Sequence, residues 1–167
     1  MSKCQNVENM TDEEKLLLDN QLCFPLYSAA NAVIRAYRPM LEQLDLTYSQ
    51  YLVMMLLWEK DGASVKDLGT RLHLDSGTLT PLLKRLEVKG FVARGRSQED
   101  ERVRVLNLTN AGQALKDSAK SVPNAMRCKI DLEVDELVTL KQLCEKVLNN
   151  LVSVSYTHLR AHETVRN

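Results

Sequence analysis

Residues 64–108 contain two short stretches with the spacing of helices, followed by a stretch with the alternating pattern of a β-hairpin. Very few residues connect these three stretches. Ser64 and Asp75 are good N-caps for the two helices, because their side-chain oxygens can accept hydrogen bonds from the free amides of a first turn. The third stretch carries apolar and β-branched side chains on both arms of a charged tip, as a β-hairpin does. Helix, turn, helix and hairpin in this order predict a winged helix-turn-helix, with the helix pair at 64–87 and the wing at 91–108.

In such a unit the second helix enters the major groove of DNA, and the wing lies against the flanking backbone. The buried stripe of this helix is rich in leucine, whereas hydroxyl and basic side chains on its other faces can meet base edges and phosphates. The expected DNA-binding residues are Ser76, Thr78, Thr80, Pro81, Lys84, Arg85, Arg94, Arg96 and Arg102. Phosphate would repel Asp100, so we expect it to support the wing through a salt bridge to Arg102. The alternatives are helix capping for Ser76 and Thr78, and solubility for Arg94 and Arg96.

The composition of the chain limits the kinds of protein and of binding site that we expect. Of the 167 residues, 22 are Lys or Arg and 22 are Asp or Glu, so the net charge is zero and any DNA-binding charge must be local. No apolar run is long enough to span a bilayer, and no secretion signal is visible, so we expect a cytoplasmic protein without a membrane partner. The four cysteines lack the close pairing of a zinc site, and we expect neither a metal nor a cofactor.

Long helical patterns flank the winged unit on both sides. A capping box at Thr11 and Glu14 opens the N-terminal pattern, and Pro25 should kink that helix or restart it. The last amphipathic helix begins near Asp135. Both patterns leave apolar stripes that need a partner, which a two-fold dimer would supply. The expected fold is therefore mainly α with a small β-hairpin wing, flanked by N- and C-terminal dimerisation helices.

The ends of the chain differ in character from the middle. Residues 1–10 are polar and aperiodic, which predicts a flexible arm, and residues 11–152 carry the winged-helix domain. Residues 153–167 break the preceding pattern and resemble vector or adaptor read-through. We therefore expect a non-native tail there.

A family resemblance joins these features. Asp100-Glu101-Arg102 followed by Leu108-Thr109 resembles the wing signature of the MarR family of winged-helix regulators, over about residues 16–151. A longer set of residues is similar to the organic hydroperoxide resistance subgroup of that family. This set is Leu22-Cys23-Phe24, Tyr27, Tyr37, Thr47-Tyr48, Gln50-Tyr51 and residues 74–85.

The resemblance implies a homodimeric repressor, not an enzyme, whose reduced form binds a double-stranded DNA operator and whose inducer is an organic hydroperoxide. Cys23 matches the sensing cysteine of the subgroup, and Tyr27 and Tyr37 match the tyrosines that support its sulfur. Cys128 lies where a two-cysteine class has its resolving thiol, which implies a disulfide with Cys23 of the other subunit. Without the resemblance, Cys23 would be interpreted as a buried, inert cysteine on a helix. The alternative for Cys128 is a spectator thiol, which would leave Cys144 or Cys4 to resolve the sulfur.

The chemistry that the resemblance implies suits these residue types. Thiolate is the reacting form of cysteine, and tyrosine hydroxyls that donate hydrogen bonds to it favour that form. Tyr27 lies one helical turn from Cys23, whereas Tyr37 is too far along the same helix and would have to come from the other subunit. Two alternatives remain: a repressor of the same fold released by a small aromatic ligand, and a thiol peroxidase that uses Cys23.

Overall fold

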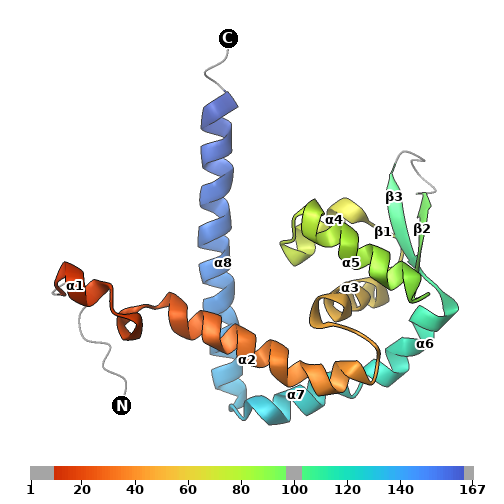
Figure 1. Ribbon diagram of the computed structural model, residues 1–167, viewed down its shortest axis with the longest axis horizontal. Coiled ribbons are helices and arrows are strands. Elements are labelled where there is room, and N and C mark those ends of the chain that lie inside the picture. The colour runs from red at the N-terminus through yellow and green to blue at the C-terminus, as the bar shows by residue number, and fades with distance from the viewer. Residues whose placement is uncertain (1–9, 97–102, 164–167) are drawn as a thin grey trace. The chain divides into compact units, whose positions relative to one another are not determined.

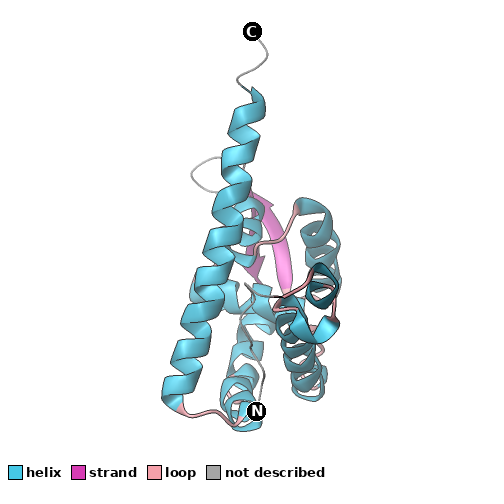
Figure 2. Ribbon diagram, turned by 90° about the vertical axis from the view of Figure 1, so that its left-hand side faces the viewer, coloured by secondary structure: helices cyan, strands magenta, loops and turns pink. Residues whose placement is uncertain are grey.

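The computed structural model describes residues 10–96 and 103–163. The chain divides into two compact units, residues 1–126 and 127–167. Helices dominate, and the strands shown in magenta in Figure 2 are a small share of the chain. This confirms a mainly α fold with a hairpin wing.

The first unit carries the winged helix-turn-helix (Figure 1). Its helices and strands, in chain order, are α1 (Asp12–Lys15), the 3-10 turn η2 (Leu18–Asn20), α2 (Cys23–Glu42), α3 (Tyr48–Glu59), β1 (Ala63–Ser64), α4 (Val65–Leu72), α5 (Ser76–Val88), β2 (Val92–Arg96), β3 (Arg104–Leu108) and α6 (Asn110–Ala119). α7 (Val122–Ile130) crosses into the second unit, which continues with α8 (Val134–Glu163).

Side-chain caps set the start of α3, α4 and α5. Thr47 forms a capping box with Gln50 before α3. Ser64 accepts a hydrogen bond from the amide of Asp67, and Asp75 accepts one from the amide of Thr78. After α5, Gly90 takes a φ of 74°, the left-handed conformation expected at that position. These local signals confirm α4 and α5 as the helix pair.

The sheet has one strand more than the expected hairpin. β2 and β3 form the wing as an antiparallel pair, with Gly95 opposite Val105. The two residues of β1 pair with the other edge of β3, so the strand order is β1-β3-β2. β1 therefore anchors the wing to the turn between α3 and α4.

The N-terminal helical pattern is broken in the structure. The apolar spacing continues from Leu18 through Tyr37, but α1 ends at Lys15 and the next long helix, α2, starts only at Cys23. Pro25 lies in the first turn of α2, where its missing amide would have no intrahelical partner. Of the two expectations for Pro25, a restart of the helix agrees with the structure.

The core of the first unit lies where α3, α4, α5 and β3 meet the end of α2. Val53, Met54 and Leu86 are fully buried, and Leu41, Leu68 and Leu106 are 1% exposed. The buried face of α5, the second helix of the pair and from here on the reading helix, therefore packs against the rest of the unit.

The second unit is dominated by α8. Many of its apolar side chains are exposed within the chain, among them Val138, Leu140, Leu143, Val147, Leu148 and Leu151. The helix continues to Glu163, through most of the segment 153–167 that the sequence pattern set apart. In the described part of the chain, no helix combines the length and the hydropathy that crossing a membrane requires.

Candidate DNA-binding surface and cysteine sites

The exposed face of α5 carries the expected DNA-binding side chains. Leu79, Leu82, Leu83 and Leu86 are buried, as their helical spacing predicts. The opposite faces are exposed and carry Ser76, Thr78, Thr80, Pro81, Lys84 and Arg85. Within the described residues, neither Lys84 nor Arg85 has a carboxylate partner, so both cations can approach phosphate.

Thr78 is tied to the cap of its own helix. Its hydroxyl donates to Oδ2 of Asp75 at 2.7 Å, and its amide donates to Oδ1 of the same carboxylate at 3.0 Å. These two hydrogen bonds to Thr78 hold the pKa of Asp75 below its usual value. The capping alternative is therefore observed for Thr78, although its hydroxyl oxygen can still accept a hydrogen bond from DNA.

Arg94 on the wing strand β2 forms an ion pair with α5. Its Nε lies 3.1 Å from Oε2 of Glu87, and both side chains are about 40% exposed. Arg96 is exposed near the end of the same strand. Arg102 and Asp100, the two expected residues of the wing tip, lie outside the described residues. The ion pair thus joins the two elements, α5 and β2, that carry the described basic side chains.

Cys23 is the first residue of α2 and is exposed. Tyr27 follows one turn later on the same helix and is 68% exposed. Tyr37 lies 14 residues beyond Cys23, which at 1.5 Å per residue is about 21 Å along the helix axis. Tyr27 can therefore approach the sulfur of its own chain, whereas Tyr37 cannot.

Tyr37 is part of a tyrosine cluster that the sequence analysis did not single out. Its ring centroid lies 4.9 Å from that of Tyr48, the first residue of α3, and 6.1 Å from that of Tyr51. Burial raises the pKa of all three phenols, and neighbouring Tyr48 raises that of Tyr37 further. The hydroxyls therefore stay protonated at neutral pH and can donate hydrogen bonds. The sequence signal for Tyr48 was its place in Thr47-Tyr48, one of the segments that carry the family resemblance.

The other described cysteines, Cys128 on α7 and Cys144 on α8, are both exposed free thiols. No group of His, Cys, Asp or Glu side chains within the described residues has the arrangement of a metal site. Cys4 lies outside those residues. Both exposed thiols are thus accessible to a partner molecule.

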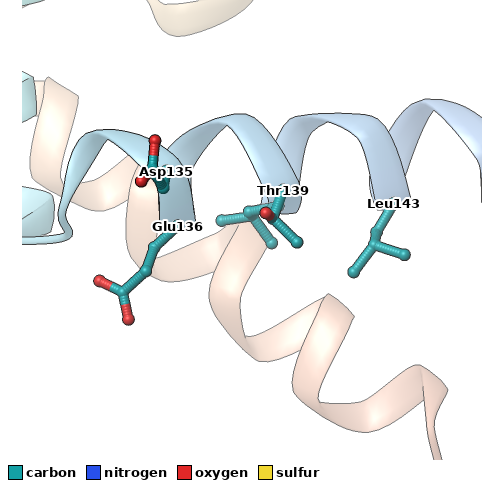
Figure 3. A pocket seen from close by; sticks show the side chains of 5 residues that line it. Asp135, Glu136, Thr139 and Leu143 are labelled. Atoms are coloured by element: carbon teal, nitrogen blue, oxygen red, sulfur yellow. The ribbon is translucent and has the colours of Figure 1, made fainter.

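Each unit has one surface hollow worth noting. In the first unit, a hollow of about 370 Å³ has an apolar floor that includes Leu56 and Leu68 and a rim that includes Lys60, Asp67 and Arg71. In the second unit, residues of α8 line an open hollow of about 360 Å³. Figure 3 shows its lining side chains along one stretch of that helix, from Asp135 and Glu136 through Thr139 to Leu143.

A protein-family model described as transcriptional regulator SarA/Rot matches residues 35–119. The chain is 47% identical over 148 residues to the HTH-type transcriptional regulator TtmR of Methylorubrum extorquens (strain PA1), covering 88% of this chain and 72% of that protein. It is 42% identical over 145 residues to the organic hydroperoxide resistance transcriptional regulator of Bacillus subtilis (strain 168), covering 87% of this chain and 97% of that protein.

Solved structures of AbfR, a protein of Staphylococcus epidermidis, are also similar. Reduced AbfR bound to DNA matches with a TM-score of 0.67 and 37% identity, over 85% of this chain and 99% of that chain. A structure of disulfide-formed AbfR matches with a TM-score of 0.56 and 36% identity, over 81% and 96%. The residues matched by the family model include the whole of the helix pair and the wing.

Proposed function

The chain belongs to the SarA/Rot family of MarR-type winged-helix transcriptional regulators, and from this premise we propose that it is a repressor released from DNA when an organic hydroperoxide oxidises Cys23. The family consists of DNA-binding regulators and is not an enzyme family. The observation that carries the proposal is that one unit holds both an exposed cysteine at the start of α2 and a reading helix, α5, whose polar face is exposed. The Bacillus relative, named for organic hydroperoxide resistance, supports the choice of inducer.

The oxidation is a two-electron transfer to the peroxide. The thiolate of Cys23 attacks one peroxide oxygen, an S–O bond forms as the O–O bond breaks, and the alkoxide leaves and takes a proton to become the alcohol. The product is a sulfenic acid. A second thiol, for which we propose Cys128 of the other subunit, then attacks this sulfur, so that an S–S bond forms and water leaves. The solved disulfide form of AbfR supports this second step by similarity only.

A second copy of the chain completes the sulfur site in this proposal. Tyr37 is about 21 Å along α2 from its own Cys23, so its hydroxyl must serve the sulfur of the other subunit. The exposed apolar side chains on α2 and α8, such as Ile34 and Leu143, fit burial in a homodimer. Two reading helices in one dimer would then address two half-sites of an operator.

Operator binding by wild type and by Cys23→Ser tests the proposal. For reduced wild type, cumene hydroperoxide should raise the operator Kd by about 5- to 150-fold, the usual range for coupling between two sites. Cys23→Ser should bind the operator like reduced wild type and keep that Kd after peroxide, because serine has no sulfur to oxidise. A gel shift on the chain's own upstream region measures both. Release of the Cys23→Ser protein by peroxide would contradict the proposal.

The ion pair between Glu87 and Arg94 gives a prediction about the DNA surface. An exposed pair of this kind contributes at most about 1 kcal/mol, so a phosphate can displace Glu87 from Arg94. Glu87→Gln should therefore tighten operator binding several-fold, because it removes a negative charge beside the DNA and frees a cation. Arg94→Ala should weaken binding and lower the slope of log Kd against log salt concentration by about 0.9. If both variants weaken binding with an unchanged slope, Arg94 positions the wing and does not contact phosphate.

The hollow between α3, β1 and α4 supports a second candidate function, release by a small aromatic ligand. Leu56 and Leu68 would contact a ring, and Lys60 would face an acidic group. The Cys23→Ser protein separates the two functions, because a ligand that needs no sulfur should still release it from the operator. Such release without peroxide would favour this candidate over the thiol switch.

A further inference from the structure

A side chain at the end of the reading helix α5 donates hydrogen bonds to the loop between α2 and α3. Lys89, the C-cap of α5, extends its Nζ to the backbone carbonyl oxygen of Asp45 and to Oδ1 of the same residue, the latter at 2.8 Å. The Lys89 side chain is 25% exposed, whereas that of Asp45 is 73% exposed. A pair with so exposed a carboxylate contributes little to stability. Its notable property is that it joins two elements 44 residues apart in the chain.

Asp45 occupies a position that normally suits glycine. The amide of Leu46 donates to the carbonyl of Leu41, and the amide of Asp45 donates to that of Glu42, which together form the Schellman motif that ends α2. The residue at this point must be left-handed, and Asp45 has a φ of 52°. A non-glycine residue pays a cost in this region. Asp45, the residue in this unfavourable conformation, is also the residue whose carboxylate accepts the hydrogen bond from Lys89.

The same loop is bracketed by the tyrosine pair. Tyr37 lies on the last part of α2 and Tyr48 opens α3, and their rings are 4.9 Å apart. Leu44 and Leu46, on either side of Asp45, are each 6% exposed, so the core holds the loop firmly. Asp45 therefore lies in a segment whose two ends are joined by the contact between Tyr37 and Tyr48, so a movement of α2 against α3 would carry Asp45 with it.

We propose that the contact between Lys89 and Asp45 is the link through which the tyrosine pair sets the position of α5. The proposal rests on the proposed function, in which the Tyr37 hydroxyl donates a hydrogen bond to the sensing sulfur of the other subunit. Oxidation changes the group that accepts this hydrogen bond, so Tyr37 shifts against Tyr48, the loop follows, and Lys89 transmits that shift to the end of the reading helix. Lys89 and Asp45 are positioning residues that touch neither the peroxide nor the sulfur.

The test measures F, the operator Kd of peroxide-treated protein divided by that of reduced protein, at fixed salt. Asp45→Gly removes the carboxylate but suits the left-handed position, so the variant should melt at or above the wild-type temperature. Lys89→Met keeps an apolar stem and removes the charge. Lys89→Met should lower F about two- to fivefold, the most that an exposed ion pair can transmit. Asp45→Gly should lower F by less, because the backbone carbonyl that also accepts from Lys89 remains. Lys120→Met is the matched control, because Lys120 pairs with Asp117 only three residues away, and its F should equal that of wild type.

The ratio separates the link from simpler effects. A loss of positive charge near DNA, or a loss of stability, changes both Kd values together and leaves F unchanged. An F in Asp45→Gly and Lys89→Met as large as in wild type overturns the link alone. An F of one in wild type overturns the peroxide function and the link with it.

Discussion

Replacing Gly112 with alanine should destabilise the winged unit by about 3 kcal/mol, at the upper end of the usual cost of overpacking. Gly112 is buried in the first turn of α6, and a Cβ there would overlap the backbone carbonyl oxygen of Phe91. It would also lie 3.0 Å from the carbonyl carbon of Phe91 and 3.3 Å from Cδ2 of Leu108. Two neighbouring hydrogen bonds resist movement: the amide of Thr109 donates to Phe91 O, and Nε1 of Trp58 donates to Gly112 O.

Thermal unfolding measures this effect. A loss of about 3 kcal/mol corresponds to a fall of roughly 6–12 °C in Tm for a chain of this size. Gly90→Ala is the control, because its Cβ would meet no atom within 4 Å and its cost of about 1–2 kcal/mol comes only from a φ of 74°. A Tm for Gly112→Ala within a degree of wild type would mean that α6 does not pack against the strand start at Phe91.

The caps show which parts of the fold a sequence reveals. Thr47, Ser64 and Asp75 each bond to an amide three residues away, so the interaction lies within one short stretch of sequence. That is why α4 and α5 begin where the sequence analysis expects. β1 has only two residues, and Ala63 pairs with Leu106, far along the chain. No local pattern reports such a pairing, and the same holds for Gly112, whose need for a bare Cα comes from Phe91.

The candidate sites follow the same rule. The split of α5 into a leucine stripe and a polar face is a helical period, and the expected buried and exposed sets agree with the structure. Tyr48 and Lys89 gain their importance from neighbours on other helices, Tyr37 and Asp45, so residue type and spacing did not reveal them. For the break before Cys23, the sequence offered a restart at Pro25 as one of two expectations but no end for α1. The apolar spacing continues across the break, although the helix does not.

Replacing Cys128 with serine should abolish the covalent dimer that peroxide produces. In the proposed function the sulfenic acid on Cys23 is resolved by Cys128 of the other subunit, and both thiols are exposed. Wild type treated with cumene hydroperoxide should run at twice the chain mass on a non-reducing gel, and Cys128→Ser should run at the chain mass. Cys144→Ser is the matched control, since Cys144 is also an exposed thiol, and it should form the dimer like wild type.

The fate of the sulfur in Cys128→Ser makes this prediction sharper. Without a resolving thiol, the oxidised Cys23 should remain a sulfenic acid, which adds one oxygen atom, or proceed to the sulfinic acid, which adds two. Intact-mass measurement detects both changes. Operator binding should still respond to peroxide at first, because the first oxidation already removes the thiolate that accepts the tyrosine hydrogen bonds. A covalent dimer that persists in Cys128→Ser and disappears in Cys144→Ser would assign the resolving role to Cys144, and its persistence in both would direct attention to Cys4.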